Sequence, residues 1–199
     1  MILSWLLMQY LLSASGADTF YNVALYKPAF QSTLYKDWTS DKGNDGGTRV
    51  AEKGGQCVQT WPFNNSWWMV DLLDSYVIKS VVLDNRNDYL GASTRLRNFK
   101  IDVFNDDPRL VSTFPTVSGD ICYNQTEPAT NGTFTWNCRR PLIGRYVRII
   151  MLPAEILNFC ELQVMSPLPT ETSEFKVYKK QMLNTTAMSK VAVSSCAVF

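Results

Sequence analysis

The stretch WWMVDL at residues 67–72 places Trp68, Val70 and Leu72 on one side of an extended chain and the residues between them on the other. This alternation has the period of two that is typical of a half-buried β-strand, and it does not fit the 3.6-residue period of a helix. Similar short runs recur further along the chain, at residues 99–104, 146–152 and 160–164.

Clusters of glycine, asparagine, aspartate and proline separate these runs, and such residues are typical of turns. No amphipathic helical stripe of useful length precedes residue 166, and the chain contains no internal repeat. The pattern therefore predicts an all-β fold, an antiparallel β-sandwich or jelly roll built from short strands.

The composition excludes several classes of function, because the 199 residues include no histidine. Without imidazole the chain cannot build a Ser-His-Asp or Cys-His nucleophile pair, or an HExxH zinc site. Its 19 Lys and Arg residues face 18 Asp and Glu residues, for a net charge of +1. Nucleic-acid binding depends on clustered positive charge, so we expect no nucleic-acid partner. No recognisable pair of catalytic carboxylates is present either, and we expect no enzymatic activity.

The amino-terminal segment predicts export from the cell. Residues 2–12 are almost wholly apolar, and small residues follow from Ser13 to Ala17. This is typical of a signal peptide spanning residues 1–17, although a buried first strand or helix would also be apolar. No other apolar run reaches the length of about 18 residues that a membrane span needs. We therefore expect a secreted, extracellular protein without a membrane span.

Four glycosylation sequons without proline support this compartment and predict a glycoprotein. Two of them lie between Cys122 and Cys138, which suggests an exposed loop closed by a disulfide. The four acceptor residues are Asn64, Asn124, Asn131 and Asn184.

The composition changes near residue 166, where prolines, serines and threonines begin to dominate. We expect a single domain over residues 18–165, a linker over 166–173 and a tail over 174–199. Four of the five cysteines fall within the domain, which predicts two disulfides, but the sequence leaves three pairings open. The fifth cysteine, Cys196, is then expected either to form an intermolecular disulfide or to remain a free thiol.

Short motifs along residues 20–165 resemble, in order, those of the F-type lectins, or fucolectins. The resemblance implies a discoidin-like β jelly roll that binds terminal L-fucose and carries a structural calcium ion. It also implies the disulfides Cys57–Cys160 and Cys122–Cys138. The matching segments are residues 22–32, 44–47, 57–60, 67–72, 85–88, 95–99, 144–147 and 159–164.

The resemblance also locates a fucose site, in which the family uses one histidine and two arginines. Gln59 stands at the histidine position, Arg86 and Asp88 open the second motif, and Arg95 closes it two residues later than in the family. Tyr89 and the leucine after it stand where members of the family have two adjacent cysteines. Guanidinium groups suit sugar oxygens, Tyr89 offers an apolar face, and the Gln59 amide can both donate and accept.

Other interpretations remain for these side chains. Arg86 and Arg95 could be surface arginines that pair with Asp84 or Asp88. Residues 67–68, two adjacent tryptophans, could form a stacking platform, although core packing fits a strand better. The loop segment Trp61-Pro62-Phe63 is the better candidate for an exposed apolar contact.

Residues 41–52 nearly spell an EF-hand loop, but no amphipathic helix flanks them, so we reject an EF-hand. The resemblance implies a different Ca²⁺ site on the same loop, with carboxylates, main-chain oxygens and one amide as ligands. Hard oxygen ligands are those that calcium prefers. The implied residues are Lys42, Asp45, Gly47, Gln56, Cys160 and Glu161.

The tail resembles the first part of a PAN/apple module over residues 175–183 and 191–199, which implies that Cys196 has its partner outside this chain. Two functional hypotheses follow. The first is a calcium-stabilised lectin that recognises fucosylated glycans on cell surfaces or glycoproteins, in adhesion or innate recognition. The second is an extracellular protein-interaction module that has lost fucose binding, as Gln59 suggests. A homo-oligomer would strengthen a weak single sugar site by avidity.

Overall fold

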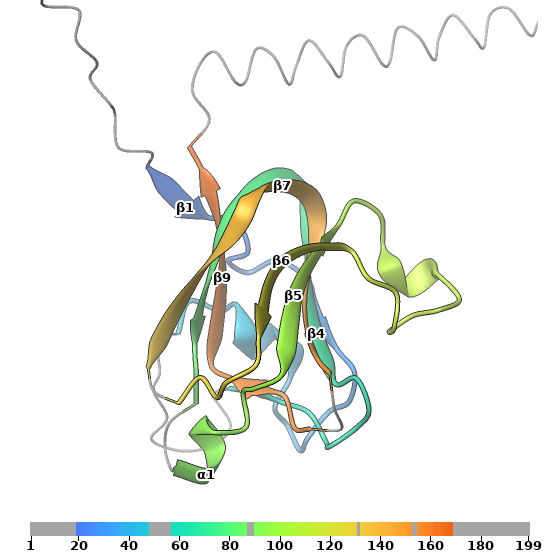
Figure 1. Cartoon of the computed structure of the whole chain (residues 1–199), viewed down its shortest axis with the longest axis vertical. Coiled ribbons are helices and arrows are strands. Elements are labelled where there is room, and N and C mark those ends of the chain that lie inside the picture. Colours follow the sequence, from blue (N-terminus) through green and yellow to red (C-terminus); the bar gives the residue numbers. More distant parts are fainter. Residues whose placement is uncertain (1–18, 48–56, 87–89, 131, 153–154, 169–199) are drawn as a thin grey trace, which may run out of the picture. The chain divides into compact units, whose positions relative to one another are not determined.

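The computed structural model describes residues 19–47, 57–86, 90–130, 132–152 and 155–168. These residues form an antiparallel β-sandwich, so the predicted fold class is confirmed (Figure 1). The strands are β1 (Phe20–Asn22), β2 (Ala29–Gln31), β3 (Val58–Gln59), β4 (Trp67–Asp84), β5 (Phe99–Phe104), β6 (Asp120–Gln125), β7 (Thr133–Met151), β8 (Asn158–Phe159) and β9 (Glu161–Pro167). The helical segments are short: η1 (Ser40–Gly43), α1 (Leu90–Ser93) and η2 (Pro108–Leu110).

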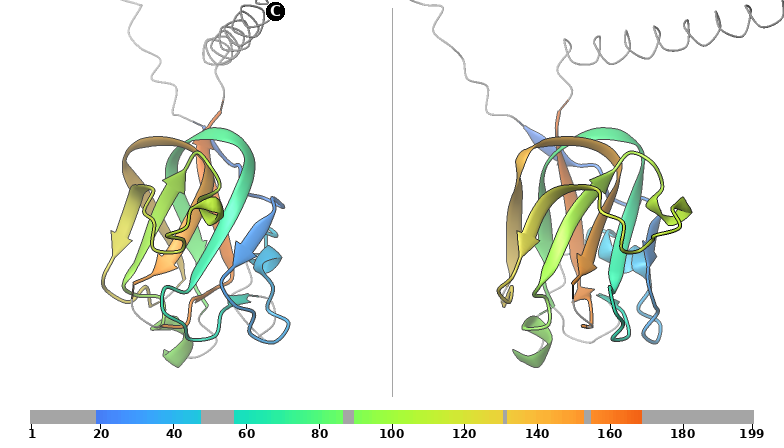
Figure 2. Two further views of the ribbon diagram at one scale, coloured as in Figure 1. Left: turned by 90° about the vertical axis from the view of Figure 1, so that its right-hand side faces the viewer. Right: turned by 45° about the vertical axis from the view of Figure 1, so that its right-hand side comes forward.

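Two long strands connect the layers of the sandwich. The main sheet has the order β1-β9-β4-β7-β5-β6, and β2 also pairs with β4. The antiparallel β4 and β7 arch together over one end of the molecule (Figures 1 and 2). Their register shifts between Asp71 and Tyr76, and Leu73 has a positive φ of 68° there. This irregularity lets both strands leave one layer and enter the other.

The alternation predicted for the start of β4 buries one face of the strand, but the structure buries residues on both faces. Trp68, Val70 and Leu72 are fully buried in the core, but Met69, on the opposite face, is also fully buried. The segment 105–119 covers this outer face, because Phe114 packs edge-on against Trp67 with ring centroids 4.9 Å apart. Core packing is thus confirmed for Trp68, whereas Trp67 is half-buried on the outer face under the covering segment.

A buried ion pair holds the covering segment on the sheet. Arg148 of β7 donates to both carboxylate oxygens of Asp102 on β5, at 3.0 and 2.7 Å. Its remaining donors bond the carbonyls of Pro115 and Val117, at 2.7 and 2.6 Å. Both charged residues are fully buried. These hydrogen bonds offset the cost of burying the two charged groups.

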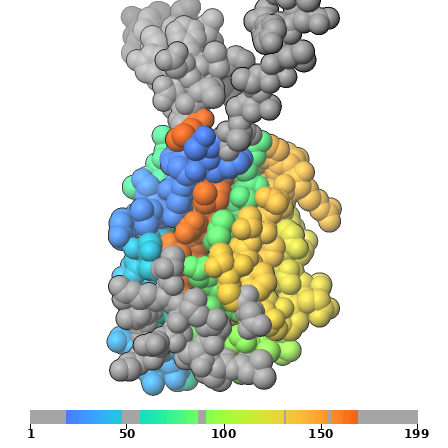
Figure 3. Space-filling model, turned by 90° about the vertical axis from the view of Figure 1, so that its left-hand side faces the viewer, coloured from blue at the N-terminus to red at the C-terminus, as the bar shows by residue number. Residues whose placement is uncertain are grey.

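The first and last strands lie side by side (Figure 3), with Tyr21 opposite Ser166 and Phe20 opposite Pro167. The expected domain end at Met165 is therefore two residues too early, because Ser166 and Pro167 still belong to β9. The rest of the linker from residue 169, the tail with Cys196 and the predicted signal peptide lie outside the described residues. No helix in the described ranges is long and apolar enough to span a membrane.

Both expected disulfides form, Cys57–Cys160 and Cys122–Cys138. The second joins β6 to β7, so the segment that it closes is partly strand rather than a loop throughout. Asn64, in a turn, and Asn124, on β6, are exposed, as glycosylation requires. Asn131 and Asn184 lie outside the described residues.

Candidate functional site

A cavity of about 490 Å³ opens among segments that are far apart in the sequence. Gln59 of β3, Arg86 after β4 and Arg95 after α1 all line it. The three described residues that the fucolectin resemblance singled out therefore converge on one site. Helix α1 lies at the end of the sandwich opposite the β4–β7 arch (Figure 1).

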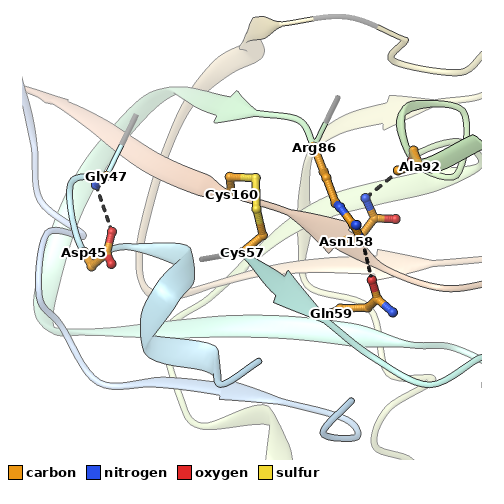
Figure 4. The surroundings of a disulfide bond; sticks show 8 residues. All are labelled: Asp45, Gly47, Cys57, Gln59, Arg86, Ala92, Asn158 and Cys160. Atoms are coloured by element: carbon orange, nitrogen blue, oxygen red, sulfur yellow. Dashed lines mark hydrogen bonds between the residues drawn. A yellow bond between two sulfur atoms is a disulfide. The ribbon is translucent and has the colours of Figure 1, made fainter. Parts of the chain in front are cut away.

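Arg86 and Gln59 form a buried pair in the wall of this cavity. Arg86 Nη1 donates to Gln59 Oε1 at 2.8 Å (Figure 4), and the two residues are only 8% and 4% exposed. This bond uses the amide oxygen of Gln59 and leaves its amide nitrogen as a donor. The interpretation of Arg86 as a solvated surface arginine is therefore wrong. Arg95 is half-buried and lines the same cavity.

Buried asparagines fix the segments that carry the two arginines. Asn85, next to Arg86, donates from its amide to the carbonyl of Ser93 at 2.9 Å and to that of Ala129. Asn158 of β8 lies opposite Gln59 in the two-stranded sheet and donates to the carbonyl of Ala92 at 3.4 Å. These bonds attach the α1 turn to the strands, so the positions of both arginines are set by the fold.

Aromatic side chains form a second wall of the cavity. The guanidinium carbon of Arg86 lies 4.6 Å from the centre of the buried Trp38 ring. Tyr35 contacts Trp38 edge-on at 5.8 Å and Trp61 at 4.7 Å. Trp61 and Phe63 are 53% and 59% exposed, so the expected exposure of this loop is confirmed, and Trp61 lines the cavity.

The loop expected to bind calcium lies on the other side of Cys57–Cys160 (Figure 4). Asn44 anchors it through bonds from its amide to the carbonyls of Ala24 and Lys27, at 2.6 and 2.8 Å. Asp45 Oδ1 accepts from the amide of Gly47 at 2.8 Å. A side chain at Gly43 would collide with Val58 and Trp68, because an added Cβ would lie within 2.9 Å of both. The loop is therefore held closely against the core.

The surroundings of the Glu161 carboxylate indicate whether a cation would fit beside this loop. Its Oε2 accepts from the amide of Gly46 at 3.1 Å, whereas its buried Oε1 has no hydrogen-bond partner. Burial, together with the negative charges of Asp45 and Asp84, raises the pKa of Glu161 to about 8. A buried acid beside another acid, with an oxygen lacking a donor, is an environment that a hard cation would stabilise.

The ligand set would be completed by main-chain oxygens. In the described part of the chain, no three Asp, Glu, Cys or His side chains gather around one point. Lys42 Nζ bonds the carbonyl of Asp37 at 2.8 Å, so only the main-chain oxygen of Lys42 suits the expected role. The carbonyls of Gly47 and Cys160 are the other candidates. Gln56 lies outside the described residues, as do Asp88 and Tyr89, which the resemblance placed in the expected fucose site.

The disulfide Cys57–Cys160 links the two sites. Cys57 precedes Gln59 by two residues, and Cys160 directly precedes Glu161. The amide of Cys160 also donates to the carbonyl of Asp84 at 2.8 Å, on the strand that leads to Arg86. Figure 4 shows the sulfur bridge between the Asp45–Gly47 loop and the Arg86–Gln59 pair. The two sites are therefore joined by the disulfide and by the hydrogen bond from Cys160 to Asp84.

Comparison with known proteins identifies the family. The family described as a NedA-like, galactose-binding domain of F5/F8 type C matches residues 42–149. Fucolectin-1 of Anguilla japonica is 33% identical over 153 residues, which cover 74% of this chain and 82% of that relative. The fucolectin of Anguilla anguilla is 36% identical over 110 residues, which cover 55% of this chain and 65% of that relative. The chain belongs to the fucolectin, or F-type lectin, family.

Solved fucolectin-like structures have the same fold. The fucolectin from striped bass serum (Morone saxatilis) superposes with a TM-score of 0.64 at 23% identity, covering 75% of this chain and 48% of that one. The lectin domain of lectinolysin, solved in complex with the Lewis b antigen, superposes with a TM-score of 0.61 at 22% identity, covering 72% and 95%. At such low identity these likenesses establish the architecture alone.

The cavity is also lined by residues that sequence reasoning missed. Tyr35, Lys36, Trp38 and Ile156 also line the cavity. A faint signal for the first three exists, since residues 34–38 read LYKDW, with two aromatic residues in a polar segment that follows no strand or helix period. Their meeting with Arg86 depends on contacts between distant segments, which the sequence does not display.

Proposed function

We propose that this fucolectin is a secreted, calcium-stabilised lectin that binds fucosylated glycans on cell surfaces or glycoproteins, in adhesion or innate recognition. The observation that carries the proposal is the convergence of Gln59, Arg86 and Arg95 on one cavity. The arginines supply planar forks of donors for the ring and hydroxyl oxygens of a sugar. Trp38 stacks on Arg86 and holds its guanidinium in place.

The free amide nitrogen of Gln59 would take over part of the role that histidine has in the family. Arg86 orients the amide, so Gln59 Nε2 can donate to a sugar hydroxyl while Oε1 stays bonded to the protein. Asp88 and Tyr89 are expected to complete the site, as an acceptor and an apolar face. Calcium would be held by Asp45, Glu161 and nearby main-chain oxygens, and its charge would stabilise the buried carboxylate.

The chemistry of the cavity supports binding without catalysis. Glycosidases commonly need two carboxyl groups flanking the scissile bond. The described residues that line the cavity include no Asp or Glu, so Asp88, the one carboxylate expected at the site, would have no second carboxyl group as a partner among them. The compartment is supported by the predicted signal peptide, the exposed sequon asparagines Asn64 and Asn124, and two disulfides, which persist in oxidising surroundings.

The second candidate is an extracellular protein-interaction module that no longer binds fucose. The replacement of the family's histidine by Gln59 favours it, because one lost hydrogen bond of about 0.5–1.5 kcal/mol matters for a weak sugar site. The two candidates predict different results on a glycan array probed with the secreted full-length chain.

Under the lectin proposal, the chain binds fucosylated glycans, free L-fucose competes, and EDTA weakens the binding. The absence of binding to every fucosylated glycan, by protein with a cooperative thermal transition in calcium, would reject the lectin proposal. That result would leave the interaction module as the better account. Homo-oligomer formation, measured by sedimentation on the same sample, would decide how far avidity contributes.

A further inference from the structure

One side of the sandwich carries two sheet edges that lie next to each other. In the described part of the chain, β6 pairs with β5 alone, and the first half of β7, residues 133–143, pairs with β4 alone. The disulfide Cys122–Cys138 joins the two strands (Figure 2). On an edge strand, alternate backbone N–H and C=O groups point away from the sheet, where another chain can pair with them. This side of the domain can therefore be extended by a further strand.

Aromatic rings fill the space between the two edges. Trp136 of β7 is only 5% exposed, and its ring stacks on Phe134 with centroids 5.5 Å apart. It also contacts Phe99 edge-on at 5.2 Å and lies 5.9 Å from the ring of Tyr123 on β6. Together with the disulfide, these contacts order both edges before any partner approaches. An edge that is already ordered loses little conformational entropy when another strand pairs with it.

One end of β6 carries features that commonly protect a sheet edge. The β5–β6 register shifts between Ile101 and Asp102, and such an irregularity twists an edge away from an incoming strand. The same end carries an exposed charged pair, because Asp120 lies 3.4 Å from Arg140 of β7. A strand that arrived at this end would meet an irregular backbone and would have to desolvate two charges.

The other end of β6, residues 123–125, has none of these features. Its register with residues 99–101 of β5 is regular, and residues 121–126 include neither a charged residue nor a proline. Glu127 and Pro128 follow only after the strand has ended. Regular strands without charge or proline are those most prone to edge-to-edge pairing. The side chains of this half of the edge, as encoded, therefore offer no protection against pairing.

Asn124 occupies the middle of this regular half, and it is the acceptor of the sequon at residues 124–126. Asn124 is exposed, and it pairs in the register with Lys100 of β5. A strand added on the free side would run about 4.8 Å from β6, with paired side chains about 4.5–5.5 Å apart. An oligosaccharide attached to Asn124 is bulky and hydrated, and would occupy the place that this strand needs.

We propose that an N-linked glycan on Asn124 blocks pairing of β6 with the same edge of a second copy of this chain. Two copies related by a two-fold axis would present the same uncharged, regular segment to each other, which is a self-complementary contact. The glycan takes the place of the charge or proline that this half of the strand lacks. The proposal requires glycosylation of Asn124, but it does not depend on fucose binding.

The test compares glycosylation variants of the full-length chain, secreted by a glycosylating cell, with the occupancy of Asn124 measured by mass spectrometry. Asn124→Gln and Thr126→Ala remove the sequon, whereas Thr126→Ser keeps it. Sedimentation velocity measures self-association beyond that of the wild type. Without the glycan, the concentration for half-association is expected to fall at least about tenfold. The amides of residues 123–125 should exchange more slowly with solvent in the associated protein.

Three further variants separate edge protection from a general gain in solubility. Asn64→Gln removes a glycan from an exposed turn outside both edge strands, and should leave self-association unchanged. Asn124→Lys lacks the glycan but places a charge on the edge, and should behave like the wild type. The double variant Asn124→Gln/Ser112→Lys has the same net charge as Asn124→Lys, with its lysine in an exposed turn, and should associate as Asn124→Gln does.

Several outcomes would overturn the proposal. It fails if Asn124 of the secreted wild type carries no glycan, or if folded Asn124→Gln and Thr126→Ala proteins associate no more than the wild type. It also fails if Asn64→Gln has the same effect, or if Ser112→Lys restores the wild-type behaviour as fully as Asn124→Lys, because any glycan or charge would then suffice. Enzymatic removal of the glycan from folded wild type repeats the comparison without a change in folding history, and no increase in association would again reject the proposal.

Discussion

Replacing Arg86 by lysine is the sharpest test of the proposed sugar pocket. Lysine keeps the positive charge but loses the planar fork of donors and its stacking on an aromatic ring. In the structure Arg86 donates to Gln59 at 2.8 Å and lies 4.6 Å from the centre of the Trp38 ring. Arg86→Lys should therefore weaken sugar binding without changing the net charge of the protein.

The expected magnitude follows from the bonds that are lost. A hydrogen bond to a charged group contributes about 1.5–3 kcal/mol, so the loss of one bond to the sugar raises the Kd about 10- to 150-fold. Since Arg86 also orients Gln59, the amide donor becomes less well placed, and the effect should lie toward the upper end. Arg86→Ala removes every one of these contacts and is expected to abolish measurable binding.

The assay is calorimetric titration with methyl α-L-fucoside in saturating calcium. Arg140→Lys is the matched control, because the side chain of Arg140, on β7, is 72% exposed, pairs with Asp120 of β6 at 3.4 Å, and does not line the cavity. Thermal unfolding checks that both variants are folded. If folded Arg86→Lys and Arg86→Ala proteins bind the fucoside within about twofold of the wild type, this cavity is not the sugar site.

Four further outcomes are expected. Gln59→His should tighten fucoside binding, and unchanged or weaker affinity in titration would contradict the role given to Gln59. EDTA should lower the Tm of the wild type but not that of Glu161→Gln; an equal shift in both would place the calcium elsewhere. Asp102→Asn should cost about 3–5 kcal/mol by leaving the charge of the buried Arg148 uncompensated, a loss visible in denaturant unfolding. In saturating calcium, fucoside affinity should change less than about twofold between pH 5.5 and 7.5, because the chain has no histidine and a bound cation would keep Glu161 ionised although its pKa is otherwise raised to about 8. A steep pH dependence under these conditions would mean that an ionisable group outside the described pocket takes part.

Sequence reasoning predicted the fold class because strand periodicity is a local property. Trp68, Val70 and Leu72 alternate in the chain and are buried in the structure, as an extended backbone dictates. It failed where a distant segment covers the outer face of a strand. Met69 and Arg148 are fully buried because residues 105–119 pack over them, and nothing in the sequence near either residue indicates this.

For the candidate site too, some residues could be predicted from the sequence and others appeared only in the structure. The family resemblance supplied Gln59, Arg86 and Arg95, together with both disulfide pairings. It did not supply Tyr35 or Trp38, whose segment follows no periodic pattern. Composition alone put the domain end at Met165, because proline and serine are typical of linkers. In the structure Ser166 and Pro167 pair with β1, a partner nearly 150 residues earlier in the chain.

The sequence by itself therefore determined the architecture, the absence of histidine chemistry and the identity of the residues that could hold a sugar. Only the tertiary structure decided that Arg86 bonds Gln59, 27 residues away, and that the rings of Trp38, Tyr35 and Trp61 stand beside them. Side-chain alternation follows from the geometry of neighbouring residues. The meeting of two arginines, an amide and three aromatic rings depends on strand register and on loops crossing at one end of a sandwich, which are set by packing across the whole domain.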